Sequence, residues 1–327
     1  MAIISNCTAS IIKDAAFALK QGHLVAFPTE TVYGLGADAT NEKAVARIYE
    51  VKGRPKDHPL IVHISSIELL DKWATEIPDY AIKLARNFWP GPMTLILPRT
   101  GLARDFITGG QDNVGIRVPA NNFALALLKT FESEGGYGIA APSANKFGAL
   151  SPTNAQAVQD ELENDLLPSD LILDGGCCEV GIESTIIDCT SDKPEILRPG
   201  AVTLNMVENI FNIKRSEESY MSAHMRNSRK VLAPGMLISH YAPKARVYLG
   251  QTPIIGQGMI AIDHIKTPLG VVRLAAPKND LEFAKTLYEA LRSGDRQGLK
   301  EICVIPPNKG TLKEAIFDRL NKSASSL

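Results

Sequence analysis

The sequence predicts an α/β (α+β) protein of two domains, a larger one built around a mixed sheet and then a smaller one with a parallel sheet. Its 327 residues exceed an ordinary domain of roughly 100 to 200 residues. Short apolar runs alternate with helical patterns on both sides of a central segment that lacks apolar periodicity. We therefore expect two folded units joined by a linker.

Apolar runs and helical faces outline the first domain. Six runs predict strands, at residues 23–27, 60–64, 93–97, 114–118, 138–141 and 184–188. Apolar residues at helical spacing predict helices around 44–51 and 81–88, and the second should begin behind Pro78. A helix at 155–162 would suit Ser151 as its capping residue, and a last helix covers 204–211.

The same alternation returns after a break. Residues 212–230 hold five basic residues against two acidic ones and no apolar pattern, which predicts a linker. Beyond it, predicted strands and helices alternate as in a small parallel-sheet domain. The strands are expected at 245–249, 259–262, 271–275 and 302–305, and the helices at 281–291 and 312–320.

The composition describes a globular chain, with 45% hydrophobic residues, 22% charged residues and a net charge of −1. Such a chain has no overall field to attract nucleic acid or a membrane, so any anion site must be local. No signal pattern and no run of 18 apolar residues occurs, so no membrane partner is expected. Five cysteines without paired metal-finger spacing favour a reduced compartment, and we expect a cytoplasmic protein.

Small polar groups and glycines gather in one segment, which reads PTETVYGLGAD from residue 28 to 38. Gly34 and Gly36 fit a dinucleotide-binding fingerprint superficially. That motif, however, opens a helix directly after a strand, and several residues separate the glycines from Phe27. The residues alone leave two alternatives, an ordinary strand-to-helix loop and a binding loop.

A stiff basic loop follows, with the sequence KGRPKDHPLIVHI. It carries Lys52, Arg54 and Lys56, and arginine together with lysine suits the oxygens of a polyphosphate. Three basic residues are more often a solvated charge run, but Pro55 and Pro59 restrict the backbone in a way that such a run does not require. No segment reads G-x-x-x-x-G-K-[ST], so a bound ATP would be held by dispersed groups. The histidines lack H-E-x-x-H spacing, and no protein-held metal site is expected.

Three further segments place polar residues beside strands, namely NVGIRVP, APSANKFGALSPT and GIESTIID with ILRPGA. Arg117 lies among apolar neighbours, and a buried arginine needs either a protein carboxylate or a substrate carboxylate as its partner. Ser143 and Ser184 place short hydroxyls next to strands, where they can line a pocket or cap a helix. The residues alone leave these alternatives open.

Taken together, these segments resemble the long, two-domain form of the threonylcarbamoyl-AMP synthase family. The family's order is kept by PTETVYGLGAD, KGRPKDHPLIVHI, WPGPMTLIL, VGIRVP, SAN followed by SPT, ESTIID and ILRPGA, and PGMLISHYAP marks the long form. The resemblance implies a twisted mixed-sheet YrdC-like domain at residues 1–212. It also implies a linker at 213–243 that acts as an active-site lid and a Rossmann-like α/β domain at 244–327.

The resemblance also implies the site residues. Threonine would be bound by Thr31, His63, Arg117, Ala141 and Ser184, with Arg117 on its carboxylate. ATP would be bound by Lys52, Arg54, His58, Asn113, Ser143, Ser151, Arg198 and Tyr241. Lys52 and Arg54 are also the implied catalytic residues. Asn113 stands where the family often has a hydroxyl residue, although an amide can donate the same hydrogen bond.

The implied activity is that of an L-threonylcarbamoyladenylate synthase, a nucleotidyltransferase acting on L-threonine, bicarbonate or carbon dioxide, and ATP. Magnesium would bind through the phosphates, and the product would pass to the machinery that modifies tRNA next to the anticodon. Weak binding of double-stranded RNA or tRNA is a further expectation. The main rival is an RNA-binding module, against which the near-neutral charge and 6% aromatic content speak. A hydrogenase-maturation carbamoyl transferase, the second rival, would require acylphosphatase and zinc-finger segments that the chain lacks.

Overall fold

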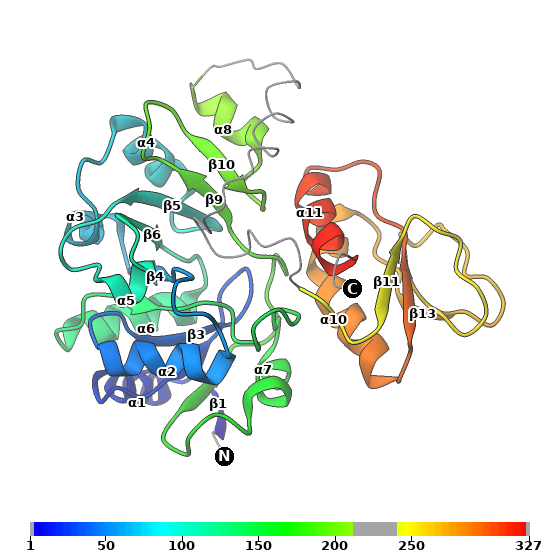
Figure 1. Ribbon diagram of the computed structural model, residues 1–327, viewed down its shortest axis with the longest axis horizontal. Coiled ribbons are helices and arrows are strands. Elements are labelled where there is room, and N and C mark those ends of the chain that lie inside the picture. Colours follow the sequence, from blue (N-terminus) through cyan, green and yellow to red (C-terminus); the bar gives the residue numbers. More distant parts are fainter. Residues whose placement is uncertain (1–2, 212–240, 325–327) are drawn as a thin grey trace.

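The computed structural model describes residues 3–211 and 241–324, which form two α/β units side by side (Figure 1). The first unit contains a ten-stranded mixed sheet and the second a four-stranded sheet whose strands are all parallel. This confirms the predicted fold class, with a mixed sheet first and a smaller parallel sheet after it.

The first sheet has the strand order β1-β8-β2-β3-β7-β4-β6-β5-β9-β10. Its strands are β1 (Ile3–Asn6), β2 (Val25–Phe27), β3 (Gly34–Asp38), β4 (Ile61–His63), β5 (Met93–Pro98), β6 (Asn113–Arg117), β7 (Ile139–Ala140), β8 (Leu171–Asp174), β9 (Thr185–Asp188) and β10 (Glu195–Arg198). In the middle of the sheet β4 pairs in parallel with β6, and this register places His63 beside Arg117.

Helices cover both faces of this sheet. They are α1 (Ala9–Lys20), α2 (Glu42–Lys52), the 3-10 turn η1 (Ile67–Leu69), α3 (Leu70–Trp73), α4 (Asp79–Phe88), α5 (Asp105–Thr108), α6 (Asn122–Ser133), α7 (Ala155–Leu162) and α8 (Leu204–Phe211). α1 and α6 pack together on one face, while α2 lies on β3 and α3 contacts β6. Successive strand residues therefore point into two different cores.

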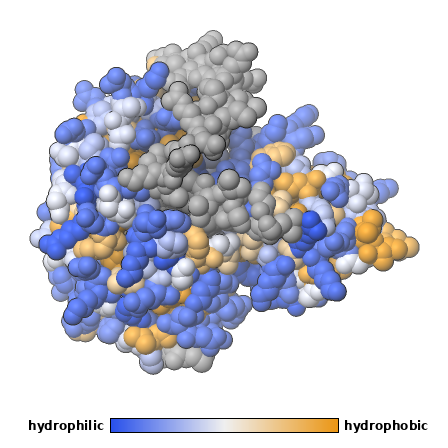
Figure 2. All heavy atoms as spheres, in the orientation of Figure 1, coloured by the Kyte–Doolittle hydropathy of each residue, from blue (hydrophilic) through white to orange (hydrophobic). Residues whose placement is uncertain are grey.

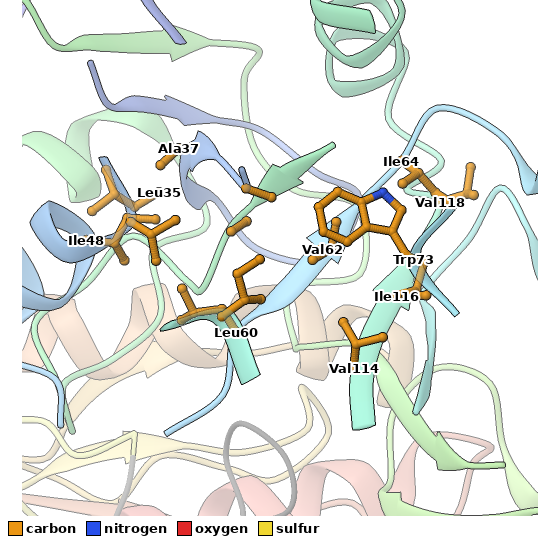
Figure 3. Close-up of a cluster of buried hydrophobic side chains, with 14 of the residues drawn as sticks. Leu35, Ala37, Ile48, Leu60, Val62, Ile64, Trp73, Val114, Ile116 and Val118 are labelled. Carbon is orange, nitrogen blue, oxygen red and sulfur yellow. The ribbon is translucent and has the colours of Figure 1, made fainter. Parts of the chain in front are cut away.

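One of these cores is drawn in Figure 3. Leu35 of β3, Val62 of β4 and Ile116 of β6 are fully buried in it. Ile48 of α2 and Trp73 of α3 belong to the same cluster. Because neighbouring strands contribute to one packed layer, the loops at their ends are held on a rigid base.

The second unit contains β11 (Arg246–Leu249), β12 (Gly258–Ile260), β13 (Val272–Ala275), β14 (Glu301–Val304), α10 (Asp280–Arg296) and α11 (Lys313–Ala324). Figure 1 shows α10 and α11 on the side of this sheet that faces the first unit. Val32, Leu150 and Ile182 of the first unit share a core cluster with Phe283 and Ile316 of these helices. The two units therefore meet through a packed apolar interface.

A close backbone approach marks this interface. Gly181 has φ +80°, and a Cβ placed on it would lie 2.4 Å from Lys285 Cα and 2.7 Å from Ala284 O in α10. Only glycine fits such a position without displacing the helix. At the opposite end of the second unit, hydrophobic atoms gather on an exposed tip (Figure 2), to which Ile254, Ile255 and Leu269 contribute.

Two sequence predictions are wrong. Residues 34–38 are not a loop but strand β3, because Gly36 lets β2 and β7 close around them; a Cβ there would lie 2.8 Å from Phe27 and from Ile139. Ser151 does not cap α7, whose first turn is capped by the side chain of Asn154. The predicted linker and lid at 213–243 lie outside the described residues, apart from 241–243.

Candidate active site

A pocket opens where several strands of the first sheet end. Its lining comes from the loop after β2, from β4 and β6, from the segment after β7, from the turn before β9, from the end of β10 and from Tyr241. The residues are Thr29, Thr31, Val32, Tyr33, Gly34, Arg54, Ile61, His63, Arg117, Ala141, Pro142, Ser143, Glu183, Ser184, Arg198 and Tyr241. Most of the predicted site residues are therefore brought together from segments far apart in the chain.

Arg117 forms one end of the pocket and is paired inside its own domain. Its Nη2 lies 2.6 Å from Oε1 of Glu30, although the angle between the groups falls outside hydrogen-bond geometry. Its Nη1 donates to Thr31 Oγ1 at 2.9 Å, and Thr31 Oγ1 lies 2.8 Å from Thr29 Oγ1. Thr29 in turn donates to Val32 O. Both charges of the pair are buried, so the arginine keeps a fixed orientation toward the pocket.

His63 lies beside Arg117 in the paired strands, and its ring meets Phe27 edge-on with centroids 6.0 Å apart. Burial, together with the positive charge of Arg117, lowers the pKa of His63 to about 3. The imidazole is therefore neutral at physiological pH. Its Nδ1 is buried without a hydrogen-bond partner among the described residues, so it can accept or donate a bond to a ligand.

The end of α2 and the loop after it supply two buried basic side chains with different surroundings. Lys52, the last residue of α2, lies behind the pocket lining, and its Nζ donates to Ser143 O at 2.7 Å and to Asn145 O. Burial, and then the charge of Arg54, hold the pKa of Lys52 well below its usual range. Arg54 lines the pocket, and its Nε is buried without a hydrogen-bond partner among the described groups. Arg54 therefore has a donor left for a ligand, whereas Lys52 holds the backbone of the neighbouring loop.

Arg198 and Ser184 form a further wall of the pocket. The Nε of Arg198 donates to Ser184 O at 3.0 Å, and its Nη2 donates to Ser184 Oγ at 3.1 Å. Ser184 Oγ also lies 2.8 Å from Thr94 Oγ1 in β5. This network fixes a second buried guanidinium at the pocket, in addition to that of Arg117.

Glu183 lines the pocket next to this wall and is held from the second domain. Its Oε2 accepts from Arg319 Nε at 2.7 Å and from Tyr288 OH at 3.0 Å. Its Oε1 accepts from Ser151 Oγ at 2.5 Å. Burial opposes ionisation of this carboxyl, but Arg319 and then Arg198 lower the pKa of Glu183 to about 2. It is therefore a carboxylate at physiological pH.

Tyr241 closes the same side. It is buried, and its ring stacks on that of Tyr288 with centroids 5.8 Å apart and an angle of 29° between the planes. The guanidinium of Arg319 lies 5.5 Å from the centre of the Tyr241 ring. The backbone of Tyr241 has φ 63°, and its carbonyl accepts from Ser323 Oγ at 2.7 Å. Three residues of α10 and α11 thus hold Tyr241 at the pocket, two through its ring and one through its carbonyl.

Several predicted site residues do not line the pocket. Lys52 and Ser151 lie behind its wall, His58 packs against Phe147 with centroids 5.3 Å apart, and Asn113 lies at the opposite end of β6 from Arg117. Glu30 and Glu183 were not predicted as site residues, although they lie in the motifs TET and EST. Only the hydroxyl residues beside them were predicted to bind a ligand.

Among residues 3–211 and 241–324, no three His, Cys, Asp or Glu side chains gather as metal ligands do. Within the same part of the chain, no helix combines the length and the apolar character that crossing a membrane requires.

Comparisons with known proteins cover the whole chain. A family model for the Sua5, YciO and YrdC proteins, described as telomere recombination, matches residues 17–200. A second model, described as the threonylcarbamoyl-AMP synthase C-terminal domain, matches residues 202–325. The threonylcarbamoyl-AMP synthase of Pyrococcus abyssi is 38% identical over 99% of this chain and 98% of its own length. That of Bacillus subtilis is 38% identical over 96% of this chain and 92% of its own.

Solved structures agree with these matches. The structure of P. abyssi Sua5 complexed with L-threonine is 38% identical to this chain, has a TM-score of 0.88, and is matched over 99% of this chain and 98% of that one. Escherichia coli YciO is 24% identical with a TM-score of 0.53 and covers 61% of this chain and 96% of its own, so the likeness concerns the fold alone.

Proposed function

The chain belongs to the Sua5, YciO and YrdC family, and from that membership we propose that it joins L-threonine, bicarbonate or carbon dioxide, and ATP into threonylcarbamoyl-AMP and pyrophosphate. Two relatives named threonylcarbamoyl-AMP synthase, which align over most of their length with this chain, support the proposal. The structural observation that carries it is a single pocket lined by three buried arginines, Arg54, Arg117 and Arg198. Such a pocket suits a ligand pair with a carboxylate at one end and a polyphosphate at the other.

In this proposal threonine occupies the side of Arg117. Its carboxylate would meet the guanidinium, while Thr31, Ser184, Ala141 and the neutral ring of His63 surround the rest of the molecule. The relative solved with L-threonine supports this choice of substrate. The threonine carboxylate would join Glu30 as a second anion at Arg117, and the bonds from Nη1 and Nε can be exchanged for it.

The nucleotide would occupy the part of the pocket lined by Arg54 and Arg198, with both arginines on the phosphates and Ser143 and Tyr241 around the remainder. Lys52 supports this wall by holding Ser143 O, and contact between Lys52 and a phosphate would require it to release that bond. Asn113, His58 and Ser151 keep their implied ATP contacts only as a proposal, since none of them lines the pocket. Arg54 and Lys52 remain the proposed catalytic residues.

The chemistry requires no covalent intermediate on the protein. The neutral threonine amine adds to carbon dioxide and loses a proton, and an oxygen of the resulting carbamate attacks the α-phosphorus of ATP. The bond to the β-phosphate breaks, and pyrophosphate leaves with its electron pair. The buried arginines would stabilise the charge that builds up on the phosphates, and the enclosed pocket would keep water from the labile product.

Magnesium fits this site as an ion bound through the nucleotide. The two pocket-side carboxylates, Glu30 and Glu183, each lie against an arginine. The donors that remain are phosphate oxygens and water, a shell that magnesium accepts readily. When bound, it would neutralise part of the phosphate charge.

The same proposal covers the enzyme class, the fate of the product and the location of the protein. We assign the chain to the nucleotidyltransferases, and its product to the machinery that transfers the threonylcarbamoyl group to tRNA. All five cysteines are free, in line with a cytoplasmic location. An RNA strand needs basic residues on an extended surface, whereas Arg54, Arg117 and Arg198 are buried. These buried arginines therefore favour a small anionic ligand over an RNA strand.

The test is a reconstitution of the reaction with the full chain. The protein is incubated with ATP, threonine, bicarbonate and magnesium, and pyrophosphate and threonylcarbamoyl-AMP are followed together. We expect both products to require both threonine and bicarbonate. Pyrophosphate release that is independent of threonine, or that stays absent when all substrates are present, contradicts the proposed function.

A further inference from the structure

The carboxylate of Glu183 stands at the pocket, yet its partners come largely from another domain. Arg319 binds it through Nε and also donates from Nη2 to the Glu183 carbonyl oxygen at 3.3 Å. Tyr288 binds the same carboxylate with its hydroxyl. The pocket wall formed by Glu183 is therefore oriented by α10 and α11, which lie more than a hundred residues away in the chain.

The charges in this cluster balance one another. Arg319 Nη1 lies 2.5 Å from Asp318 Oδ2, and Lys322 Nζ lies 2.7 Å from Asp318 Oδ1. Two cations, Arg319 and Lys322, thus face two anions, Glu183 and Asp318. The negative charge of Glu183 is met mainly by Arg319, and the more weakly acting Arg198 at the pocket contributes less.

Removing Arg319 would upset this balance. Glu183 and Arg198 are close enough that each affects the other's pKa, so a Glu183 carboxylate deprived of Arg319 would pair with Arg198. The cation at the nucleotide side would then be neutralised from within. The ring of Tyr241, which lies against Arg319 and Tyr288, would lose a neighbour in the same step.

We propose that Arg319 is a positioning residue for the nucleotide: it neutralises Glu183 and seats Tyr241, so that Arg198 directs its charge at the phosphates. This assigns part of the active site to the second domain. The inference rests on the proposed function, because it takes the ligand on this side to be ATP. The Arg117 side, whose counter-ion comes from the first domain, should not depend on Arg319.

Calorimetric titration with ATP and with threonine, on the full chain, tests this. Arg319→Met should weaken ATP binding by about ten- to hundredfold, the range of one charge-assisted interaction. Threonine affinity should stay within about threefold of wild type. The double variant Glu183→Gln/Arg319→Met removes both charges, and it should bind ATP at least about fivefold more tightly than Arg319→Met alone. A residue that merely joins the domains would give no such rescue.

Arg292→Met is the matched control, because Arg292 is also a buried arginine of α10 that crosses the interface. It donates to Leu150 O at 2.8 Å, and no carboxylate of the described residues accepts a hydrogen bond from it. It should lower the melting temperature but keep ATP affinity within about threefold of wild type. An equal loss of ATP affinity in Arg292→Met would attribute the effect to domain docking and overturn the proposal.

Other outcomes also test the proposed role of Arg319. ATP binding by Arg319→Met at wild-type strength, or a double variant as weak as the single one, contradicts the proposed role. If Arg319→Met does not fold, the double variant is compared with Glu183→Gln: ATP affinities within threefold support the role, and a tenfold weaker double variant opposes it. Wild-type protein that neither binds ATP nor releases pyrophosphate would instead count against the proposed function itself.

Discussion

Two buried arginine–glutamate pairs adjoin one pocket, and they are built differently. Arg117 and Glu30 lie 2.6 Å apart and both belong to the first domain. Glu183 and Arg319 lie 2.7 Å apart and belong to different domains. The first pair is complete once the central sheet has formed, whereas the second exists only when α11 docks. The side assigned to threonine is thus intrinsic to one domain, and the side assigned to ATP is shared.

The largest effect is expected where the intrinsic pair is broken. Arg117→Ala leaves the buried carboxylate of Glu30 without its cation, which should lower the free energy of unfolding by about 3 to 5 kcal/mol. Threonine binding should weaken by about ten- to hundredfold, and ATP binding much less. Denaturant unfolding and calorimetry with each ligand measure these changes. Equal weakening of both ligands would assign Arg117 a purely structural role.

The shared side can be disturbed from the interface alone. Gly181→Ala introduces a methyl group that meets Lys285 and Ala284, and it does so at φ +80°. Overpacking and backbone strain together should lower the free energy of unfolding by about 2 to 4 kcal/mol. ATP affinity should fall more than threonine affinity, which the change reaches only through the bond from Gly181 N to Thr31 O at 3.1 Å.

Gly250→Ala is the control for this change. Gly250 has φ 68°, and a Cβ there would meet nothing within 4 Å. The control therefore carries the backbone strain without the clash, and it should leave the affinity for both ligands unchanged. Equal losses of threonine and ATP affinity in Gly181→Ala would contradict the distinction between the two sides.

The pH dependence of the free energy of unfolding tests the protonation state of His63. Its folded pKa of about 3 lies below its ordinary value of 6.5, so below pH 6.5 the unfolded chain takes up a proton that the folded chain does not. Stability should therefore fall as the pH falls, by about 2 kcal/mol between pH 6.5 and 5. His63→Asn should lose this slope, and His264→Asn, at an exposed position, should retain it. Identical slopes in both variants would contradict the buried, neutral state of His63.

The smallest effect should come from a single hydroxyl. Tyr288→Phe keeps the ring that stacks on Tyr241 but removes one of the bonds to Glu183, while Arg319 stays in place. We expect a loss of about 1 kcal/mol in ATP binding, roughly fivefold, and no change for threonine. Titration of each ligand measures it. A loss as large as that of Arg319→Met would shift the main positioning role from the arginine to the tyrosine.

The sequence predicted the general fold because most core strands are rich in apolar residues, as at 60–64 and 93–97. It did not predict β3, because glycines are typical of a loop and the pairing of β3 with β2 and β7 is not visible in the local sequence. The motifs also identified Arg117, Ser184 and Arg198. Their contacts with the ligands are still predictions.

The partners of these residues could not be predicted in the same way. Arg319 lies in α11 one residue after Asp318 and three before Lys322, a local pattern typical of a solvated helix face. Its burial against Glu183 is a tertiary contact that no local periodicity encodes. The pairing of Glu30 with Arg117 is likewise a tertiary contact that no local periodicity encodes. Sequence motifs therefore indicated what lines the pocket, but not what holds the lining in place.

Hydrogen exchange of the wild-type chain with each ligand alone tests the division of the pocket most directly. Threonine should slow exchange in β6 and the segment after it, where Arg117 and Ala120 meet Glu30, and leave α11 unchanged. ATP should slow exchange in α11, because the nucleotide completes the wall that Arg319 supports. If ATP protects only the first domain and α11 exchanges as in the free protein, the second domain has no part in the nucleotide site.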